Sequence, residues 1–368
     1  MPPDVTVGIC CLNGADSIGR TIAAVRAQTI APAIELIVVD DGSTDDTASV
    51  AEGLGARVIR HARNRGPAAA RNSIAHAASA PVVLYIDDNC DAESDWAERH
   101  LRLYDDPRVV GTGGPMAGGP ERGWTQRYLA RNNPAGYLEA SVGESDALLW
   151  RLRQYVSRMW RDSTPEAPVP AYAFAGGIMG FRRAAFLAVG GFDERYAFGP
   201  EDYDLCLRIQ DALPTAILMA DPGAVVTHHY PRSPFDALRR SVSYGRNGGA
   251  LYRRRPQMRL APLPLPVLTL GLIVAGRRRP SMIGLAALLP HLLHPGGLRS
   301  ALRDRRPDRL LDAYATLARE TATDVGYLQV VIAGERQRDA SGPEPDPVLL
   351  AEAEAAISRA GDRTGSPA

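Results

Sequence analysis

Three apolar runs and one shorter Val-Ile pair, separated by segments long enough for helices, occupy the first ninety residues of the chain. Residues 5–11, 35–39 and 81–86 are rich in valine, isoleucine and leucine, and residues 57–60 supply the pair. Short runs of this composition are typical of buried strands. Strands that alternate with helices form a parallel sheet covered by helices on both faces. The sequence therefore predicts an α/β fold built on a mostly parallel sheet.

Acidic residues directly follow the last of these runs. Asp87, Asp88 and Asn89 come immediately after residue 86, at the place where α/β proteins hold ligands, outside the carboxyl ends of their strands. Mg²⁺-like ions take few protein carboxylates and share the phosphates of a substrate, so this position suits a cation that bridges a diphosphate. A second acidic cluster lies at residues 199–204. The two clusters together predict a metal–diphosphate site and a separate base.

The charge balance and the residue usage exclude several classes of function. The formal net charge is +0, so no nucleic-acid partner held by bulk electrostatics is expected. The chain contains no lysine, which excludes a Schiff-base mechanism and a Walker lysine. Its 4 cysteines form no CxxC pair, so neither a zinc site nor a disulfide framework is expected. Cys10 and Cys206 lie in apolar patterns and are expected to pack as small hydrophobic residues.

The second half of the chain is less regular. Strands are expected at residues 109–112 and 224–229 and a helix at residues 201–209, while residues 171–181 are apolar and ordered. An arginine-rich helix is expected over residues 233–259. We divide the chain into a catalytic domain (1–232), a helical, partly apolar extension (233–335) and a disordered tail (336–368) with a short helix near residues 348–360.

A long apolar stretch, residues 260–293, is interrupted by three arginines and a proline at residues 277–280. Its halves hold 17 and 13 residues, against the roughly 20 that a membrane-spanning helix needs. Three prolines also weaken the first half as a helix. Two interpretations remain open, a membrane-associated hairpin or interfacial segment and a buried helical extension. The N-terminus has no signal-peptide pattern, so we expect a cytoplasmic location, with the inner face of the plasma membrane as the site of any contact.

These motifs, in this order, resemble family 2 glycosyltransferases with the GT-A fold over roughly residues 4–232. The matching segments are Ile9-Cys10-Cys11-Leu12-Asn13, Val38-Val39-Asp40-Asp41-Gly42-Ser43-Thr44-Asp45, Arg65-Gly66-Pro67-Ala68-Ala69-Ala70-Arg71-Asn72, Tyr85-Ile86-Asp87-Asp88-Asn89, Gly190-Gly191-Phe192-Asp193-Glu194 and Glu201-Asp202-Tyr203-Asp204-Leu205-Cys206-Leu207-Arg208. The resemblance implies a Rossmann-like, mostly parallel sheet with helices on both faces. It also implies an inverting transferase that uses a nucleotide-diphosphate sugar, in cell-envelope or glycoconjugate biosynthesis.

The resemblance implies a set of donor-binding residues. Asp41 would accept a hydrogen bond from the base, and Arg71 would reach the nucleotide. Asp87 would contact the ribose or the nucleotide. Gly176 and Gly177 would allow the backbone to approach the donor or acceptor closely. The implied donor-binding residues are Cys10, Asn13, Asp41, Arg71, Asp87, Gly176 and Gly177.

The resemblance also implies a divalent cation, Mn²⁺ or Mg²⁺, on the donor diphosphate. Asp88 would bind it, with Asn89 standing where many family members have a third acid. His228 and His229 end a strand where related enzymes supply a histidine to the metal or the diphosphate. Strand alternation allows only one of the two to face the site. The amide oxygen of Asn89 is a weaker ligand than a carboxylate, so metal dependence needs a direct test.

Asp202 is the general base implied for the acceptor hydroxyl, with Glu201 sharing or tuning that role. Each functional assignment also has an ordinary structural alternative. In these alternatives, Asp40 and Asp41 would only cap the next helix, and Arg71 would be a solvated helix residue. The acids after residue 86 would form a surface turn, and Asp202 would complement the dipole of its helix. His228 and His229 would be structural, and Gly176 and Gly177 would only mark a turn.

Residues 239–246 bear on whether one sugar or many are transferred, and two other functions remain as alternatives. Processive members of the family carry a Gln-x-x-Arg-Trp motif after the base, and residues 239–246 contain none. Transfer of one sugar is therefore expected, to an acceptor sugar, a lipid-linked glycan or a small metabolite. A non-catalytic sugar- or lipid-binding scaffold on the same fold is the main alternative. A sugar-phosphate nucleotidyltransferase is a weaker one, because that class needs a basic glycine-rich loop after its first strand.

Overall fold

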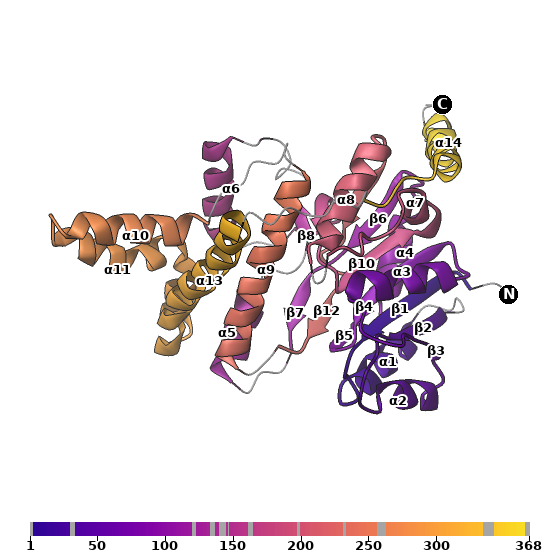
Figure 1. Cartoon of the computed structure of the whole chain (residues 1–368), viewed down its shortest axis with the longest axis horizontal. Helices are drawn as coiled ribbons and strands as arrows, with labels where there is room; N and C mark the ends of the chain where they lie inside the picture. The colour runs from indigo at the N-terminus through magenta and orange to yellow at the C-terminus, as the bar shows by residue number, and fades with distance from the viewer. Residues whose placement is uncertain are drawn as a thin grey trace.

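The structure is a computed structural model in which part of the chain is placed well enough to describe. The described residues are 3–29, 34–119, 123–132, 137–139, 145, 147–160, 165–196, 199–230, 233–255, 263–333 and 342–364. Every structural statement below refers to these residues (Figure 1).

Strands and helices alternate through the first ninety residues, as the sequence predicts. The strands are β1 (Val5–Cys11), β2 (Ile34–Asp40), β3 (Arg57–Arg60), β4 (Val82–Asp87), β5 (Cys90–Ala92), β6 (Val109–Gly113), β7 (Met116–Gly118), β8 (Tyr137–Glu139), β9 (Val169–Phe174), β10 (Ile178–Arg182), β11 (Ile217–Ala220) and β12 (Val226–His228). The helices of the same part are α1 (Ile18–Arg26), α2 (Thr47–Gly53), α3 (Pro67–Ala77), α4 (Trp96–Leu103), α5 (Trp124–Arg131), α6 (Leu148–Trp160), α7 (Arg183–Ala188) and α8 (Glu201–Ala212).

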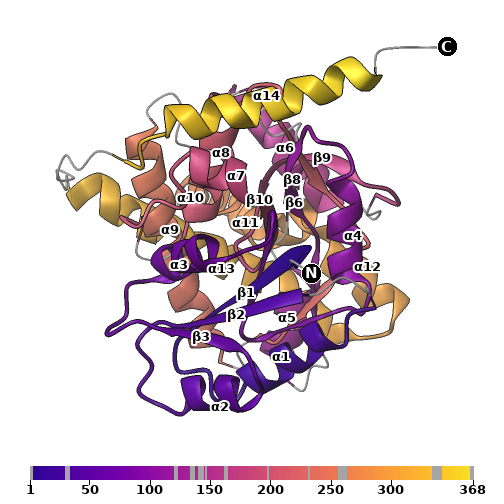
Figure 2. The same cartoon turned by 90° about the vertical axis from the view of Figure 1, so that its right-hand side faces the viewer.

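Among the described residues, nine strands form the main sheet in the order β3-β2-β1-β4-β10-β6-β11-β9-β8. The first four strands are parallel, and β10 runs antiparallel to both of its neighbours, β4 and β6. Strand β11 is parallel to β6, and β9 is antiparallel to β11. The predicted mostly parallel sheet is therefore confirmed, with reversed strands in its second half (Figures 1 and 2). The carboxyl ends of β1, β2 and β4 lie at one edge.

Both faces of the sheet are buried. Side chains of successive strand residues point to opposite faces, and each face packs into its own hydrophobic core. In β2, Ile37 and Val39 pack into one core, and Val38 packs into the core on the other face. Strand β1 contributes Val5 and Val7 to that second core. Near-continuous apolar runs are what a strand buried on two faces requires, which explains the runs that open the sequence.

A second, three-stranded sheet, with the order β5-β12-β7, lies beside the main one. Its strand β5 follows β4 after two residues, and β12 pairs antiparallel with it so that His228 lies opposite Cys90. This pairing joins a segment near residue 90 to a segment near residue 228. It carries the histidines predicted at a strand end to the edge of the main sheet where β4 ends.

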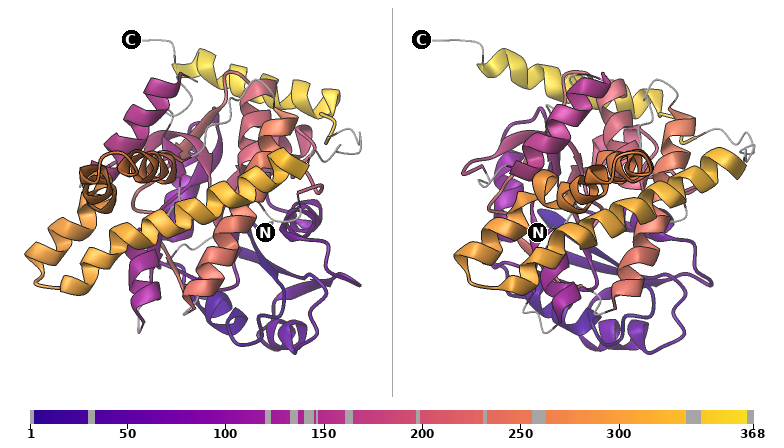
Figure 3. Two further views of the ribbon diagram at one scale, coloured as in Figure 1. Left: turned by 60° about the vertical axis from the view of Figure 1, so that its left-hand side comes forward. Right: turned by 90° about the vertical axis from the view of Figure 1, so that its left-hand side faces the viewer.

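The helical extension begins with α9 (Pro234–Arg254) and continues through α10 (Pro264–Gly276), α11 (Ser281–Leu293), α12 (Pro295–Arg303), a 3₁₀ turn (Pro307–Leu310) and α13 (Leu311–Ala333). Helices α9 and α13 cross at two glycines. A Cβ atom on Gly245 would meet the carbonyl oxygen of Thr323, and one on Gly326 would meet the carbonyl oxygen of Val242. The two backbones are therefore in direct contact (Figure 3).

Replacing Gly245 by alanine is expected to destabilise the fold by about 1–3 kcal/mol, because the added methyl group meets backbone atoms that cannot move aside. Gly248, one turn further along the same helix, is the matched control. A Cβ there has nothing within 4 Å, so Gly248→Ala should stabilise the fold by up to about 1 kcal/mol through helix propensity alone. Urea unfolding of the two variants measures the difference. Equal free energies of unfolding would contradict the close crossing.

The apolar stretch expected at residues 260–293 forms the two antiparallel helices α10 and α11, which we call the hairpin. Pro264 and Pro266 do not weaken helix α10. Pro264 begins the helix and Pro266 lies in its first turn, where a missing N–H costs little. The interpretation as a buried extension is wrong, because most of the large apolar side chains of the hairpin are exposed. In the described part of the chain, no helix has the length and apolar character needed to cross a membrane.

The short helix expected in the tail is present. Residues 347–364 form helix α14, which packs on α7, and the side chains of Ala353 and Ile357 are buried in the core beneath it. The sequence pattern does not show this buried face, because it is formed by contacts with distant residues. The expected disorder concerns the rest of the tail, of which residues 336–341 and 365–368 lie outside the described residues.

Candidate active site

The site is built where β4 ends and α8 begins. Arg71, on α3, lies between the two and is only 6% exposed. Its guanidinium donates to Asp87 of β4 at 3.2 Å and to Glu201 of α8 at 2.7 Å. The cation therefore ties a strand end to a helix start more than a hundred residues away in the sequence.

Two predicted site residues bind each other. Arg71 is expected from the sequence to reach the nucleotide, and its guanidinium is buried and holds two carboxylates of the protein. Glu201 is expected to share or tune the role of the base, and it is 3% exposed and paired with that guanidinium. Asp87 stays about one-third exposed, so one side of its carboxylate remains open to a ligand.

Asp202 is the second residue of α8 and is partly exposed. One carboxylate oxygen accepts a hydrogen bond from the N–H of Gly176 at 2.8 Å, and the other accepts one from the N–H of Tyr203 at 2.7 Å. Removal from water raises the pKa of Asp202 to about 7, the neighbouring Glu201 carboxylate adds to the rise, and Arg71 opposes it. A carboxylate with such a pKa accepts protons effectively near neutral pH.

The turn between β9 and β10 needs both of its glycines. A Cβ on Gly176 would lie 2.8 Å from the Arg71 guanidinium, and a Cβ on Gly177 would lie 2.5 Å from a carboxylate oxygen of Asp87. The groups that a Cβ here would meet are side chains of the protein, so the close approach to a donor or acceptor stays a prediction. The turn also supplies the N–H that orients Asp202.

Asp88 points in the opposite direction from Asp87, as neighbours on a strand end do. Its Oδ2 accepts hydrogen bonds from the Cys11 thiol at 3.1 Å and from the Ser17 hydroxyl at 3.2 Å. Burial raises the pKa of this carboxyl, and the two hydrogen bonds oppose the rise. The carboxylate predicted to bind the metal is thus directed toward the turn between β1 and α1.

Asp41, the residue expected to bind the base, directly follows β2, and its carboxylate is held by neighbouring groups of the protein. It is 5% exposed, and its carboxylate accepts the N–H groups of Arg65 and Gly66 at 2.8–3.2 Å. Its Oδ1 also lies 2.6 Å from Nδ1 of His61. Asp41 therefore holds the loop that leads into α3.

The two predicted donor contacts on the first strand and the turn after it differ in their exposure, since Cys10 is partly exposed and Asn13 is exposed. The Asn13 side chain accepts the N–H of Thr44 at 2.8 Å, which joins two turns and leaves its backbone in the left-handed region at φ 54°. Cys10 is partly exposed and pairs in register with Asp87 across β1 and β4. Burial raises the pKa of the Cys10 thiol to about 12, so it is a neutral side chain in the wall of the site.

The two histidines after β12 face different partners. His228 is 7% exposed, and its Nε2 lies 3.4 Å from the amide nitrogen of Asn89. His229 turns to Asp91, with 2.7 Å between its Nε2 and a carboxylate oxygen. His228 is thus the histidine beside the acidic strand end, which decides between the two.

His228 has one buried ring nitrogen whose hydrogen bonding is not satisfied. Its Nδ1 has no hydrogen-bond partner among the described residues. Burial lowers the pKa of this imidazole to about 4, so it stays neutral, with a lone pair on one of its two ring nitrogens. No group of three His, Cys, Asp or Glu side chains that could hold a metal occurs in the described residues. A cation here would therefore need further ligands from outside the protein, such as the oxygens of a diphosphate.

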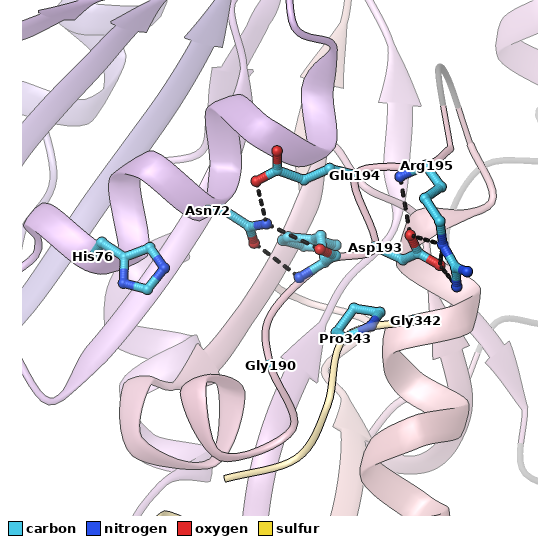
Figure 4. A pocket seen from close by; sticks show the side chains of 9 residues that line it. Asn72, His76, Gly190, Asp193, Glu194, Arg195, Gly342 and Pro343 are labelled. Atoms are coloured by element: carbon cyan, nitrogen blue, oxygen red, sulfur yellow. Dashed lines mark hydrogen bonds and ion pairs between the residues drawn. The ribbon is translucent and has the colours of Figure 1, made fainter. Parts of the chain in front are cut away.

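The loop of residues 190–196 connects α7 to the acidic cluster and is held by Asn72 (Figure 4). The Asn72 amide donates to the carbonyl of Phe192 at 2.9 Å and to Glu194 at 3.0 Å, and it accepts the N–H of Phe192 at 2.8 Å. A cavity of about 480 Å³ lies beside this loop, with Gly342 and Pro343 in its wall. None of its lining residues is an acid of the site, so this cavity is separate from it.

Two residues near the site escaped the sequence analysis. Tyr244, on α9, is about half exposed. Partial removal from water raises the pKa of its phenol, and the charges of Asp87 and Asp202 add to the rise. His61 completes the contacts of Asp41 and also reaches Ser73 at 2.9 Å. Helical spacing alone does not show which face of α9 is directed toward these acids.

Comparison with known protein families gives two matches in the first part of the chain. A family model described as glycosyl transferase family 2 matches residues 6–186. A second model, described as the N-terminal domain of galactosyltransferase, matches residues 159–216. Together they span residues 6–216, which include the strand end at Asp87 and helix α8.

Two curated relatives are similar to parts of this chain. The pre-mycofactocin glycosyltransferase of Mycobacterium tuberculosis is 30% identical over 263 residues, which is 71% of this chain and 50% of that protein. The succinoglycan biosynthesis protein ExoU of Rhizobium meliloti is 44% identical over 91 residues, 23% of this chain and 26% of that one. The chain thus spans at most about half the length of these relatives.

Among solved structures, the mannosyltransferase PcManGT from Pyrobaculum calidifontis, in complex with GDP-Man and Mn²⁺, is similar with a TM-score of 0.53. The match covers 91% of this chain and 89% of that one at 19% sequence identity. At this identity the likeness establishes the fold, which is the GT-A arrangement with additional C-terminal helices.

Proposed function

Since the chain belongs to glycosyltransferase family 2, we propose that it moves one sugar from a nucleotide-diphosphate donor to an acceptor hydroxyl, with inversion at the anomeric carbon. The observation that carries this proposal is the arrangement of Asp202 and Asp87 about the buried Arg71. One partly exposed carboxylate is oriented by backbone N–H groups, and another ends the strand beside which a donor would lie.

Asp202 is the proposed general base. As the acceptor oxygen bonds to the anomeric carbon, its proton passes to the Asp202 carboxylate. The bond from that carbon to the diphosphate oxygen breaks at the same time, and the nucleoside diphosphate leaves with the electron pair. The two N–H groups that hold the carboxylate fix the direction of its open lone pairs. A single base on one face of the sugar is consistent with inversion.

Asp87, Asn89 and His228 are proposed to hold the donor diphosphate together with a divalent cation, Mn²⁺ or Mg²⁺. Support comes from the partnerless Nδ1 of His228 and from the exposed part of the Asp87 carboxylate. A cation bound there would offset the negative charge that develops on the leaving group. Asp88 remains a proposed ligand only if its carboxylate turns away from Cys11 and Ser17.

The acceptor is proposed to be a sugar, a lipid-linked glycan or a small metabolite, and transfer is proposed to stop after one sugar. Residues 239–246 support single transfer, because they form part of α9 and lack the processive motif. The charges of Asp87 and Asp202 act on the phenol of Tyr244 of this helix, so we place Tyr244 on the acceptor side of the site. The cytoplasm, including the inner face of the plasma membrane, is the proposed place of action.

A panel of nucleotide-diphosphate sugars, scored by release of the nucleoside diphosphate, tests the proposed function. With one donor, release is expected in the presence of Mn²⁺ or Mg²⁺ and is expected to fall by 10²-fold or more, to order of magnitude, after chelation. His228→Ala should weaken activation by the cation, and His229→Ala, at the neighbouring position, serves as the matched control. The donor is expected to stay intact in the Asp202→Asn variant.

Two outcomes would contradict the proposal. Release that is unchanged by chelation would remove the cation from the site. Donor binding in calorimetry without release, whatever acceptor is supplied, would identify the chain as a non-catalytic scaffold on this fold.

A further inference from the structure

The hairpin exposes a large apolar surface to its surroundings. Nine of its large aliphatic side chains are each between 39% and 62% exposed. They are Val267, Leu268, Leu270, Ile273, Val274, Ile283, Leu285, Leu288 and Leu292. In Figure 1 the two helices run side by side away from the rest of the chain. A large exposed apolar surface of this kind marks an interaction site, because its exposure to water is unfavourable.

The base of the hairpin is fixed to the helical extension, so its direction is defined. The N–H of Leu263 donates to Asp324 of α13 at 2.9 Å, and the Tyr314 hydroxyl donates to the carbonyl of Ala287 at 2.9 Å. Leu265, in the first turn of α10, is fully buried. The exposed side chains therefore belong to an arm that the body holds in place (Figure 3).

The charge on this arm has one sign. Arg277, Arg278 and Arg279 form the turn at its tip, and all three are exposed. From residue 256 to residue 303 the sequence contains six arginines and no aspartate or glutamate. An apolar surface whose own charges are all positive is complementary to a bilayer that carries anionic headgroups.

The length of the arm decides how it meets such a surface. Thirteen helical residues extend about 20 Å, less than the roughly 30 Å of a hydrocarbon core. Entry tip first would also place three arginines within that core, which is costly. Lying flat places the aliphatic side chains at the boundary with the acyl chains and the guanidinium groups beside the phosphates.

We propose that the hairpin of α10 and α11 is a docking arm that lies flat in one leaflet of an anionic phospholipid bilayer, with the arginines at its tip bound to lipid phosphates. This contact does not depend on the proposed sugar transfer, and it is measured without donor or acceptor. It assigns a surface and a lipid chemistry to the membrane contact of this chain.

Flotation of the full-length protein with vesicles tests the proposal. Binding is expected to vesicles of phosphatidylcholine and phosphatidylglycerol in equal parts, and it should weaken as salt screens the headgroup charge. Binding to pure phosphatidylcholine vesicles is expected to be much weaker. Free inorganic phosphate, added as a competitor, should leave the binding largely intact if a bilayer is the partner. Equal binding to both vesicle types, or no binding to either, would overturn the proposal.

Substitutions separate the two parts of the surface. Arg277→Gln, Arg278→Gln and Arg279→Gln together are expected to weaken binding to the anionic vesicles on the order of 100-fold. The matched control removes three arginines from α1 and β3, by Arg26→Gln, Arg57→Gln and Arg60→Gln, and should leave binding unchanged. An equal loss in both triple variants would show that only net charge matters, which would overturn the proposal.

A second set tests the apolar face. Leu270→Gln, Ile273→Gln and Leu288→Gln together should abolish binding while far-ultraviolet circular dichroism and thermal unfolding stay unchanged, because these side chains are exposed. The other occupant of such a face is a second copy of the chain. Light scattering that shows a dimer in the wild type and a monomer in this variant, without vesicle binding by either, would assign the face to self-association and overturn the proposal.

Discussion

Replacing Asp202 by asparagine is expected to lower kcat by about 10²–10⁴-fold, the range that a positioned general base contributes. Asparagine keeps the shape of the side chain and can still accept one of the two backbone hydrogen bonds. It has no carboxylate to take the proton of the acceptor. Donor binding, measured by calorimetry, should therefore change little. An exposed acid on the same helix gives the control, and Asp211→Asn should stay within twofold of the wild type.

The same residue predicts the pH dependence of the wild type. A base works only when it is deprotonated, so kcat/KM should rise with pH and level off above the pKa of Asp202, which lies at about 7. Glu201→Gln removes a neighbouring negative charge that raises this pKa, so the rise should move to lower pH. A profile that is flat from pH 5 to 9 in the wild type would contradict the assignment of Asp202 as the base.

Replacing Arg71 by methionine is expected to destabilise the fold by about 3–5 kcal/mol. The substitution leaves Asp87 and Glu201 without the guanidinium that both contact, and Glu201 is almost fully buried. Urea unfolding measures the loss. An exposed pair supplies the control, because Arg60 and Glu52 are each about half exposed and Arg60→Met should cost less than about 1 kcal/mol.

A second substitution separates the charge from the packing. In the background of Arg71→Met, Glu201→Gln removes the buried carboxylate left without its partner, and it should restore part of the lost free energy of unfolding. Activity should recover less than stability does, because Asp87 and the turn at Gly176 also lose a contact with the guanidinium. A loss no larger than that of Arg60→Met would show that the Arg71 bridge adds little to stability.

The sequence predicts the framework of this fold well because its signal is local. Strands β1 to β4 begin and end within a residue of the expected apolar runs, since a strand buried on two faces has to be apolar along its whole length. The order of the motifs likewise places Asp87 and Asp202 at a strand end and a helix start. These features depend on residues that are neighbours in the chain.

The contacts that the sequence does not reveal join distant segments. Nothing near Arg71 in the sequence shows that its guanidinium meets Glu201, 130 residues later. The motif that contains Asp41 likewise does not show that His61 and the N–H groups of residues 65 and 66 occupy its carboxylate. Acidic side chains at a strand end can face a ligand or the protein, and the partners that decide between them come from other elements.

Helix α14 changes what kind of addition the helical extension is. The chain leaves the α/β part at α9, builds the extension, and returns to cover α7 with Ala353 and Ile357. The hydrogen bond from the N–H of Asp346 to the carbonyl of Ala188, at 2.8 Å, closes this path. In its topology the extension is therefore an insertion attached to the α/β part at both ends. These two attachments limit how far the docking arm can move relative to the acidic strand end. A truncation before residue 342 would release one tether and uncover part of the core.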